Sequence, residues 1–390
     1  MTIIGNKIES GGYLKSIKYI GFYNAFNNIN ENRNTFLSAT NKMDYIASKL
    51  KQIGMDVEFV SPSWTNNNKY YKGKTIQLEE SIYLKLFPTL PWNKYSKILS
   101  ILYSQLLLFL FLLFHTSKNE KVIAYHSLFL MYPLYYAKKI RRFNLILEVE
   151  EIYQDVNNFP KPITKMENKM FGIADQYIFS TELLNENLNI KNKPYSVIYG
   201  TYQVEEERKF KFDDDKIHVV YAGTFDPKKG GSAAAAAAAA HLDSNYHVHI
   251  IGFGSEKDIK SLKDLISDIS KKTNCTLTYD GLLKGEEYIQ FIQSCDIGLS
   301  TQQPEAKYNE TSFPSKVLSY LSNGLRVVSI RIRAIEESEI SDLLYFYDND
   351  SPEEIASTIK RIDFSNKYDS REKISKLSER FVRDIKELIK

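Results

Sequence analysis

Two turns in the second half of the sequence combine glycine, lysine and a helix start, the composition of a phosphate-binding loop. The first runs from Gly223 to Gly231 (GTFDPKKGG), between an expected strand and an expected helix. Its glycines let backbone amides approach an anion, Lys229 adds positive charge, and the helix N-terminus adds its dipole. The alternative is an ordinary strand-to-helix turn whose lysines are solvated.

The second turn is FPSK at residues 313–316, which opens another short helix. Proline suits a first helical turn because its missing N–H costs nothing there, and Ser315 and Lys316 then lie among unpaired amides. Two helix starts of this kind in one domain favour a diphosphate ligand. A third turn, from Gly252 to Gly254, is weak evidence alone.

A histidine and three carboxylates follow expected strands in the first half and could act as a general base toward a hydroxyl group. These candidates are His126, Glu150, Glu151 and Asp155. Carboxylates just beyond a strand end are well placed to face a cleft, although a surface carboxylate is usually only solvated. Arg33 and Asn34, after the first strand, are candidates for binding the molecule that carries the hydroxyl.

The elements that must position these residues form two successive α/β series. We expect strands at 18–25, 56–60, 121–125, 144–149 and 176–179, a charged linker at 205–216, and strands at 217–222, 246–251, 276–279, 297–300 and 326–330. The apolar spacing of residues 37–53 predicts a helix between the first two strands, and hence a parallel β-α-β unit. Ligands of such sheets bind beyond the carboxyl ends of the strands. Two α/β halves joined by a linker predict two domains with a cleft between them.

Two helices complete this expectation. Eight consecutive alanines, residues 233–240, predict a helix that lies closely on the sheet, because alanine is the best helix former and has a small side chain. The alternative is an engineered or sequencing artefact. Residues 370–390 predict a charged, amphipathic C-terminal helix.

The segment from Val219 to Val328 resembles the nucleotide-sugar-binding domain of GT-B glycosyltransferases, especially the glycosyltransferase family 4-like group. The resemblance lies in YAGTFDPKKGG, HIIGFGSE, YDGLLKGEEYIQFIQSCDIGLS and FPSKVLSYLSNGLRVVS. Less strongly, YIGFYNA, AYHS, LILEVEEIY, ADQYIFS and VIYGTY resemble the acceptor domain, and bacterial exopolysaccharide and capsule enzymes are the most similar members. The resemblance implies an α/β GT-B fold with two Rossmann-like domains facing across a cleft. The acceptor domain would span 1–204, the donor domain 205–369, and the helix at 370–390 would cross back to the first.

The resemblance places a nucleotide-sugar donor on the second domain. Lys229 matches the family lysine that contacts the donor diphosphate. The family's arginine after the first glycine is Thr224 here, and Lys316 is expected to compensate for the lost charge. Further donor-binding residues implied by the matching motifs are Gly223, Gly252, Gly254, Tyr279, Gly281, Leu282, Thr311, Ser312, Phe313, Ser315 and Ser319.

Two family glutamates are replaced in this chain. They fall on Thr311 and Ser319, and since the second normally holds the donor ribose, ribose recognition must differ. Glu310, beside the first position, could approach the donor sugar and act in catalysis, or it is an exposed loop carboxylate. Whether the sugar configuration is retained or inverted therefore stays open.

The sequence predicts catalysis without a metal or other cofactor. Glycosyl transfer develops negative charge on the leaving diphosphate, and Lys229, Lys316 and two helix dipoles meet that need. No Asp-x-Asp metal motif is evident, because Asp213-Asp214-Asp215 lies in the linker, where a solvated acidic run is expected.

The apolar stretch 98–114 (ILSILYSQLLLFLFLLF) is just short of a bilayer span. It is either a patch that dips into the membrane surface between flanking lysines or a buried core helix, since a spanning helix would interrupt the α/β series. Residues 1–204 contain 24 Lys and Arg against 16 Asp and Glu, and the remainder 27 against 32. The basic first half favours contact with an anionic membrane surface. No zinc spacing, RNP-type motif or helix-turn-helix pattern supports a nucleic-acid partner.

The composition is that of a soluble globular protein. Of 390 residues, 43% are hydrophobic and 25% charged, which excludes a disordered, collagen-like or disulfide-scaffold chain. With two cysteines, Cys275 and Cys295, and no signal-peptide pattern at the start, we expect a cytoplasmic protein, peripheral on the inner face of the plasma membrane.

We therefore expect a metal-independent glycosyltransferase that moves a sugar from a UDP-sugar to a glycan or lipid-linked acceptor in surface polysaccharide or glycoconjugate synthesis. A homo-oligomer is left open. The alternatives are a nucleotide-sugar epimerase or hydrolase on the same fold, and a sugar-nucleotide-binding protein without transfer activity, which the missing glutamates keep open.

Overall fold

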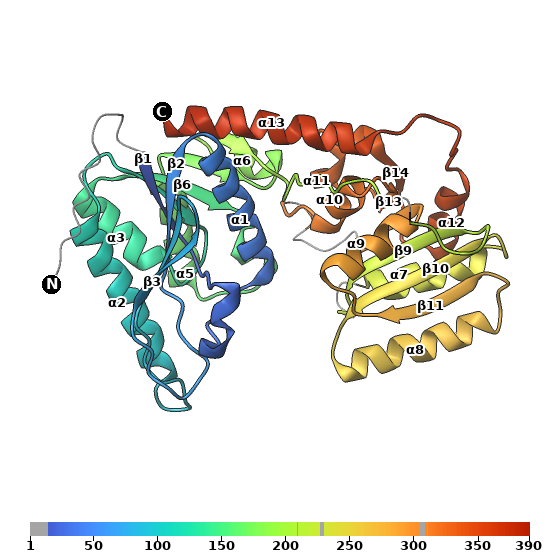
Figure 1. The fold of residues 1–390 in the computed structure, drawn as a ribbon, viewed down its shortest axis with the longest axis horizontal. Coiled ribbons are helices and arrows are strands. Elements are labelled where there is room, and N and C mark those ends of the chain that lie inside the picture. Colours follow the sequence, from blue (N-terminus) through green and yellow to red (C-terminus); the bar gives the residue numbers. More distant parts are fainter. Residues whose placement is uncertain (1–14, 209, 227–229, 304–308, 310) are drawn as a thin grey trace. The chain divides into compact units, whose positions relative to one another are not determined.

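The computed structural model describes residues 15–208, 210–226, 230–303, 309 and 311–390. The chain forms two compact units and two sheets (Figure 1). The first sheet lies mostly in unit 1, with β8 (Tyr195–Val197) and part of β7 (Gln176–Phe179) assigned to unit 2, and the second sheet lies wholly in unit 2. Unit 1 comprises Met1–Glu148, Pro160–Tyr177 and Val382–Lys390, and unit 2 comprises Val149–Phe159 and Ile178–Phe381.

The first sheet has eight strands in the order β3-β4-β2-β1-β5-β6-β7-β8. Their bounds are β1 (Lys15–Ile20), β2 (Met55–Ser61), β3 (Lys74–Glu79), β4 (Ile82–Leu86), β5 (Lys121–Tyr125), β6 (Asn144–Val149), β7 (Gln176–Phe179) and β8 (Tyr195–Val197). The expected β-α-β unit is confirmed, because β1 pairs with β2 in parallel and α1 (Leu37–Gln52) connects them. The antiparallel β3–β4 pair was not expected from the sequence.

Helices between these strands are α2 (Lys97–His115), α3 (Met131–Arg141), α4 (Tyr153–Val156), α5 (Lys161–Ile173) and α6 (Glu182–Leu188), with a 3-10 helix at Phe26–Glu31. In unit 1, α2 packs against α3, and α3 packs against α5. One face of α2 is buried and the other is exposed, so the apolar stretch is not wholly a core helix.

The second sheet has six strands in the order β11-β10-β9-β12-β13-β14, and all its pairs are parallel. The strands are β9 (Ile217–Thr224), β10 (Tyr246–Phe253), β11 (Thr276–Gly281), β12 (Ile297–Ser300), β13 (Arg326–Ile330) and β14 (Leu344–Tyr347). The helices are α7 (Gly231–Ala238), α8 (Glu256–Ser270), α9 (Gly285–Ser294), α10 (Ser315–Ser322), α11 (Arg333–Glu336), α12 (Pro352–Lys360) and α13 (Ser370–Ile389). Short 3-10 helices lie at Ala239–His241 and Ser341–Leu343.

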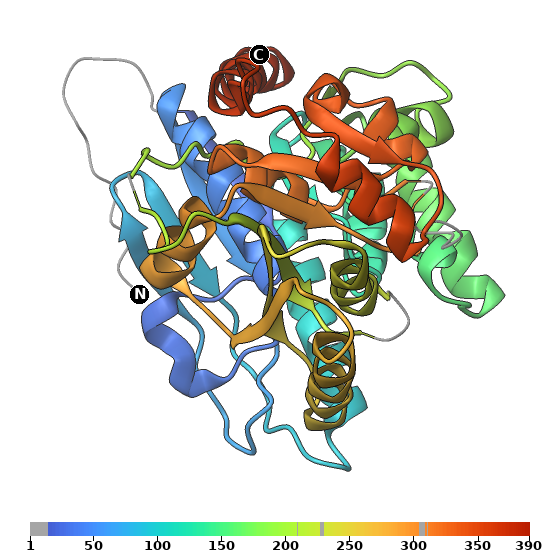
Figure 2. The same ribbon diagram turned by 90° about the vertical axis from the view of Figure 1, so that its right-hand side faces the viewer.

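The alanine run forms the expected helix. It makes up most of α7 and continues into the 3-10 helix, and four of its alanines (Ala235, Ala236, Ala238 and Ala239) have no exposed surface. The helix packs against β9 and β10, with α8 and α12 as its neighbours (Figures 1 and 2). The small side chains thus permit close packing on three sides.

The C-terminal helix α13 contributes to both units. Its first residue, Ser370, donates to the carbonyl of Leu321 in unit 2 at 2.8 Å. Its last turns, Val382–Lys390, belong to unit 1, where Lys121 donates to the carbonyl of Leu388 at 2.8 Å. The predicted return of this helix to the first unit is confirmed.

Each sheet has a point at which the strand order reverses. In the first sheet, successive strands run outward in opposite directions from β1 and β5; in the second, from β9 and β12. Ligands of open α/β sheets bind beyond the carboxyl ends of the strands at such a switch point. The β9–β12 pair is therefore where a ligand of unit 2 is expected.

Candidate functional site

A lysine lies at the β9–β12 switch point of unit 2. The ammonium of Lys316, in the first turn of α10, lies 4.1 Å from the ring centre of Tyr221 in β9. The same ammonium lies 3.3 Å from the position that a Cβ on Gly223 would take. The structure thus brings Lys316 and the first glycine turn together, as the diphosphate prediction requires.

The position of α10 is set by Tyr320, whose ring is completely buried. Its hydroxyl accepts from the amide of Ala222 at 2.8 Å and reaches the carbonyl of Leu299 at 3.4 Å, which ties α10 to both switch-point strands. Gly298 leaves room for the ring, because a Cβ there would lie 2.4 Å from it.

A second helix start is fixed beside the first. The hydroxyl of Thr301, just after β12, donates to the carbonyl of Gly231 at 2.7 Å, at the start of α7. A Cβ on Gly231 would lie 2.3 Å from the Thr301 carbonyl oxygen, and Gly230 has a φ of 67°. Both positions therefore require glycine, and the amides at the starts of α7 and α10 point in the direction from which an anion can bind, although the Val317 amide in α10 already donates to the carbonyl of Pro314.

The third glycine turn is needed for backbone packing. Gly252 has a φ of 137°, and a Cβ there would lie 1.8 Å from the carbonyl oxygen of Gly223. A Cβ on Gly254 would lie 2.9 Å from the Cβ of Phe225. These glycines let the carboxyl ends of β9 and β10 come close together.

Three of the predicted donor-binding residues, Tyr279, Gly281 and Leu282, lie at the carboxyl end of β11. Tyr279 is half-buried, packs edge-on against Phe225 with ring centres 5.6 Å apart, and has the ammonium of Lys263 5.3 Å from its ring centre. Gly281 takes a left-handed φ of 87°, and Leu282 is exposed. These residues offer an apolar surface near the glycine turns.

The two positions that replace family glutamates are already engaged. Thr311 is buried, and its carbonyl accepts from the Thr181 hydroxyl at 2.9 Å. The Ser319 hydroxyl lies 3.0 Å from the hydroxyl of Tyr288, a group whose pKa is raised by burial. A serine in this hydrogen bond cannot hold a ribose as a glutamate would.

The other predicted donor residues vary in exposure. Thr224 and Ser315 are exposed and Ser312 is half-buried, while Phe313 stacks on Tyr199 with ring centres 4.9 Å apart. Lys229 and Glu310 lie outside the described residues.

The predicted base candidates occupy different surroundings. His126 is 3% exposed, 3.4 Å from a carboxylate oxygen of the buried Glu167 and packed against Phe171. In this structure a substrate hydroxyl has no access to it. Glu150, Glu151 and Asp155 are half-buried, and the Glu150 carbonyl accepts from the Ser180 hydroxyl at 2.7 Å.

The prediction that Arg33 binds a substrate is wrong for this structure. Its guanidinium has no exposed surface and donates to Glu31 at 2.6 Å and to the carbonyls of Ser63 and Phe87 at 2.9 and 3.0 Å. Arg33 therefore holds three loops of unit 1 together. Asn34 is half-buried, and its amide donates to the carbonyl of Trp64.

The acidic run at 213–215 is exposed at all three residues, as expected for a linker. In addition, the carboxylate of Asp214 lies 2.8 Å from Nε2 of the buried His218. Asp214 thus belongs to a polar cluster on the sheet.

Two residues of the site were missed from the sequence. Tyr221 supports the Lys316 ammonium, and Thr301 anchors the start of α7. The hydroxyl-bearing ring of Tyr221, beside the aliphatic residues Val219, Val220 and Ala222, was a signal that could have been used. Together the described residues can bind an anion through one ammonium and two helix starts.

Comparison with known proteins places this site in a family context. Residues 203–380 match the family model of glycosyl transferases group 1. No curated protein sequence matches the chain.

Solved structures share the fold over nearly the whole chain. Sucrose-phosphate synthase from Thermosynechococcus elongatus is 12% identical with a TM-score of 0.67, covering 96% of this chain and 98% of that one. Anabaena Alr3699/HepE in complex with UDP and glucose is 11% identical with a TM-score of 0.61, covering 96% and 99%. The lipopolysaccharide outer core galactosyltransferase WaaB is 16% identical with a TM-score of 0.60, covering 95% and 98%. These likenesses confirm the predicted architecture of two Rossmann-like sheets and a C-terminal helix.

Proposed function

We propose that the chain is a group 1 glycosyltransferase that transfers a sugar from a UDP-sugar to a hydroxyl of a glycan or lipid-linked glycan. The observation that carries the proposal is the Lys316 ammonium beside Gly223, between two helix starts at the switch point of unit 2. The choice of UDP draws on the Anabaena structure, which holds UDP and glucose.

The chemistry follows from where charge develops. As the bond between the sugar and the diphosphate breaks, negative charge grows on the leaving oxygens, and Lys316 and the first-turn amides of α7 and α10 stabilise it. This stabilisation is stronger in the transition state than in the bound donor, so it accelerates transfer. We place the donor on residues 205–369 and the acceptor on residues 1–204 with the helix 370–390. For an inverting reaction, the half-buried Glu150 and Glu151 are the candidates for the base.

The melting temperature of the full chain with UDP, GDP or ADP tests the donor. A ligand that binds only the folded state raises the melting temperature by mass action. We expect the largest rise with UDP. A larger rise with GDP or ADP would reject the UDP assignment. Donor turnover without an acceptor would favour a hydrolase or epimerase, and binding without turnover over a panel of lipid-linked acceptors would favour a binding protein.

The site of action is proposed to be the cytoplasmic membrane surface, where lipid-linked glycans of surface polysaccharides would be extended. Among the described residues, α2 is the helix long and apolar enough to cross a membrane by length and composition. Five of its apolar side chains recur every fourth residue and are exposed: Ile98, Leu102, Leu106, Leu110 and Phe114. On the neighbouring helix α3, the side chains of Tyr132, Tyr136 and Ile140 are also four residues apart and exposed.

We call these eight side chains the α2–α3 face. Exposed Lys94, Lys97 and Lys118 flank the ends of α2, while Lys121 is engaged with α13. An apolar stripe beside lysines fits a helix that lies in the interface of an anionic membrane. The buried opposite side of α2, which includes Leu108 and Leu112, keeps the helix attached to unit 1.

A further inference from the structure

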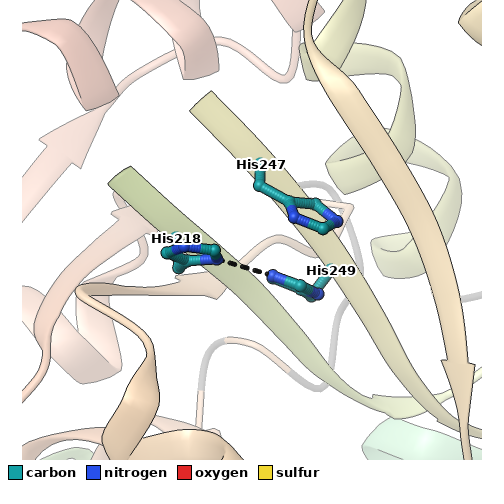
Figure 3. Close-up of side chains that lie close together, drawn as sticks. All are labelled: His218, His247 and His249. Carbon is teal, nitrogen blue, oxygen red and sulfur yellow. Dashed lines mark hydrogen bonds between the residues drawn. The ribbon is translucent and has the colours of Figure 1, made fainter. Parts of the chain in front are cut away.

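Three of the chain's six histidines meet on one face of the second sheet. His218 lies near the start of β9, and His247 and His249 lie on β10 (Figure 3). Each offers a ring nitrogen within 4.8 Å of the others. His218 and His249 are buried, and His247 is half-buried.

The backbone register explains why the rings converge. In the parallel β9–β10 pair, His218 is opposite His247, so their side chains leave the same face of the sheet. His249, two residues along β10, returns to that face. The rings of His247 and His249 stack with centres 3.7 Å apart, and Nδ1 of His218 lies 2.9 Å from Nε2 of His249.

The outer nitrogen of each ring is held by an oxygen acceptor. Nε2 of His218 lies 2.8 Å from Asp214, Nδ1 of His249 lies 3.1 Å from Asp280, and Nε2 of His247 lies 3.0 Å from the hydroxyl of Thr278. Metal-bound histidines characteristically donate their second ring N–H to a carboxylate, carbonyl or hydroxyl, which fixes the tautomer and turns the other nitrogen toward the metal.

From this arrangement we propose that His218, His247 and His249 bind a divalent transition metal such as Zn²⁺ at the amino ends of β9 and β10. The inner nitrogens, Nδ1 of His218, Nε2 of His249 and Nδ1 of His247, are the ligands. Zn–N bonds of 2.0–2.1 Å place ligand nitrogens about 3.4 Å apart, so the His218 and His249 nitrogens must separate by about half an ångström. The His247 ring must also tilt out of its stack on His249, because a metal lies in the plane of each imidazole ring that binds it. The carboxylates of Asp214 and Asp280 balance the charge of the ion.

The proposed ion has a structural role. Phe212, at the end of the linker, stacks on His218 with ring centres 4.1 Å apart and on His249 at 5.0 Å, and Phe291 of α9 meets His249 edge-on at 5.1 Å. The donor turns lie at the other end of the same strands, about 16 Å from His218 at 3.3 Å per residue. A bound ion therefore joins the linker to the sheet without touching the donor.

The test uses the untagged full chain, stripped with EDTA and titrated with Co²⁺ and Zn²⁺. We expect one equivalent of Co²⁺ to give the visible absorption bands of a tetrahedral N-ligand site, and Zn²⁺ to raise the melting temperature. His247→Gln should weaken binding by about 100-fold or more, and Asp280→Asn by about 10- to 100-fold. The matched control is His241→Gln, whose histidine is exposed and pairs with Glu353 outside the cluster.

Two results would overturn the proposal. One is the absence of both cobalt bands and a zinc-induced shift in the wild-type chain. The other is unchanged binding in His247→Gln, which would assign the metal to other groups. A UDP-induced rise in melting temperature that His247→Gln retains shows that the variant is folded, so its loss of metal binding is not a folding defect.

Discussion

A single charged residue is central to the way in which unit 2 is proposed to hold a diphosphate. Where group 1 relatives are expected to have an arginine after the first glycine, this chain has the exposed Thr224, and the Lys316 ammonium reaches Gly223 from α10 instead. The ring of Tyr221 lies beneath that ammonium and restricts its position. A cation held in place by an aromatic ring needs little reorganisation when the leaving diphosphate becomes more negative.

Replacing Lys316 with alanine should therefore weaken UDP binding by about 10- to 100-fold, the effect of losing one charge-assisted hydrogen bond. Titration calorimetry with UDP measures the change. Lys271→Ala is the control, because that side chain is 68% exposed and pairs only with Asp268 one turn earlier on the surface. Equal affinities of wild type and Lys316→Ala would show that the diphosphate is bound elsewhere.

At the scale of single residues, the sequence predicted which turns lie close together better than it predicted which side chains are exposed. Lys316 and the three glycine turns come together because strand ends and helix starts follow from local patterns. Arg33 and His126 follow strands just as convincingly, yet both are buried against groups distant in sequence. These are the carbonyls of Ser63 and Phe87 for Arg33, and the carboxylate of Glu167 for His126. Burial of this kind depends on tertiary packing, which a single sequence does not reveal.

At the scale of elements, the packing of α10 depends on a single glycine. The helix approaches β12 closely because Gly298 has no side chain where the Tyr320 ring lies. Gly298→Ala should lower the free energy of unfolding by about 1–3 kcal/mol through overpacking, and should reduce the UDP-induced shift because Lys316 moves with α10. Chemical denaturation measures the first effect. In the control Gly172→Ala, in α5, the new Cβ meets no atom within 4 Å, so stability should stay level or rise.

The α2–α3 face carries a second prediction at this scale. Replacing Leu102 and Leu106, which are 56% and 53% exposed, with glutamate should lower binding to phosphatidylglycerol vesicles by about 10-fold or more per substitution. Co-sedimentation measures the bound fraction, with phosphatidylcholine vesicles as the uncharged comparison. Ile190→Glu is the control, because Ile190 is 86% exposed but lies outside this face.

The same proteins also show whether the α2–α3 face binds a second copy of the chain instead of a membrane. If the wild-type chain ignores vesicles but forms a dimer that the Leu102 and Leu106 substitutions dissociate, the face is a contact between two copies. That result would contradict the membrane proposal and leave the donor site unaffected.

The strands whose bounds were predicted correctly are those with a clear apolar pattern in the sequence. The strands at 121–125, 144–149, 176–179, 297–300 and 326–330 have the expected bounds, because each is a short apolar run between polar turns. The β3–β4 pair, β8 and β14 were missed. Strand β3 is largely exposed, with a polar sequence (KTIQLE) that lacks a buried apolar run, and it is held by antiparallel pairing at the sheet edge rather than by its own pattern.

For the whole molecule, the two-sheet architecture follows from the order of strands and turns. The second sheet places its glycine turns at the carboxyl ends of its strands, so the position of the proposed donor site follows from the sequence. The histidine cluster could not, because His218 and His247 are 29 positions apart and only the β9–β10 register brings them together.

Removal of metal by a chelator distinguishes the two sites proposed for unit 2, the donor site and the histidine site. The donor site at the carboxyl ends of β9 and β10 has a lysine and helix amides for the diphosphate, whereas the histidines lie at the amino ends of the same strands. In a chain loaded with zinc, EDTA should lower the melting temperature but leave the rate of UDP release from a UDP-sugar unchanged, when the assay runs well below the unfolding temperature. Turnover that EDTA abolishes and Mn²⁺ restores would contradict metal-independent transfer. A melting temperature that EDTA does not change would instead contradict the histidine site, because an ion that stabilises the folded chain must destabilise it on removal.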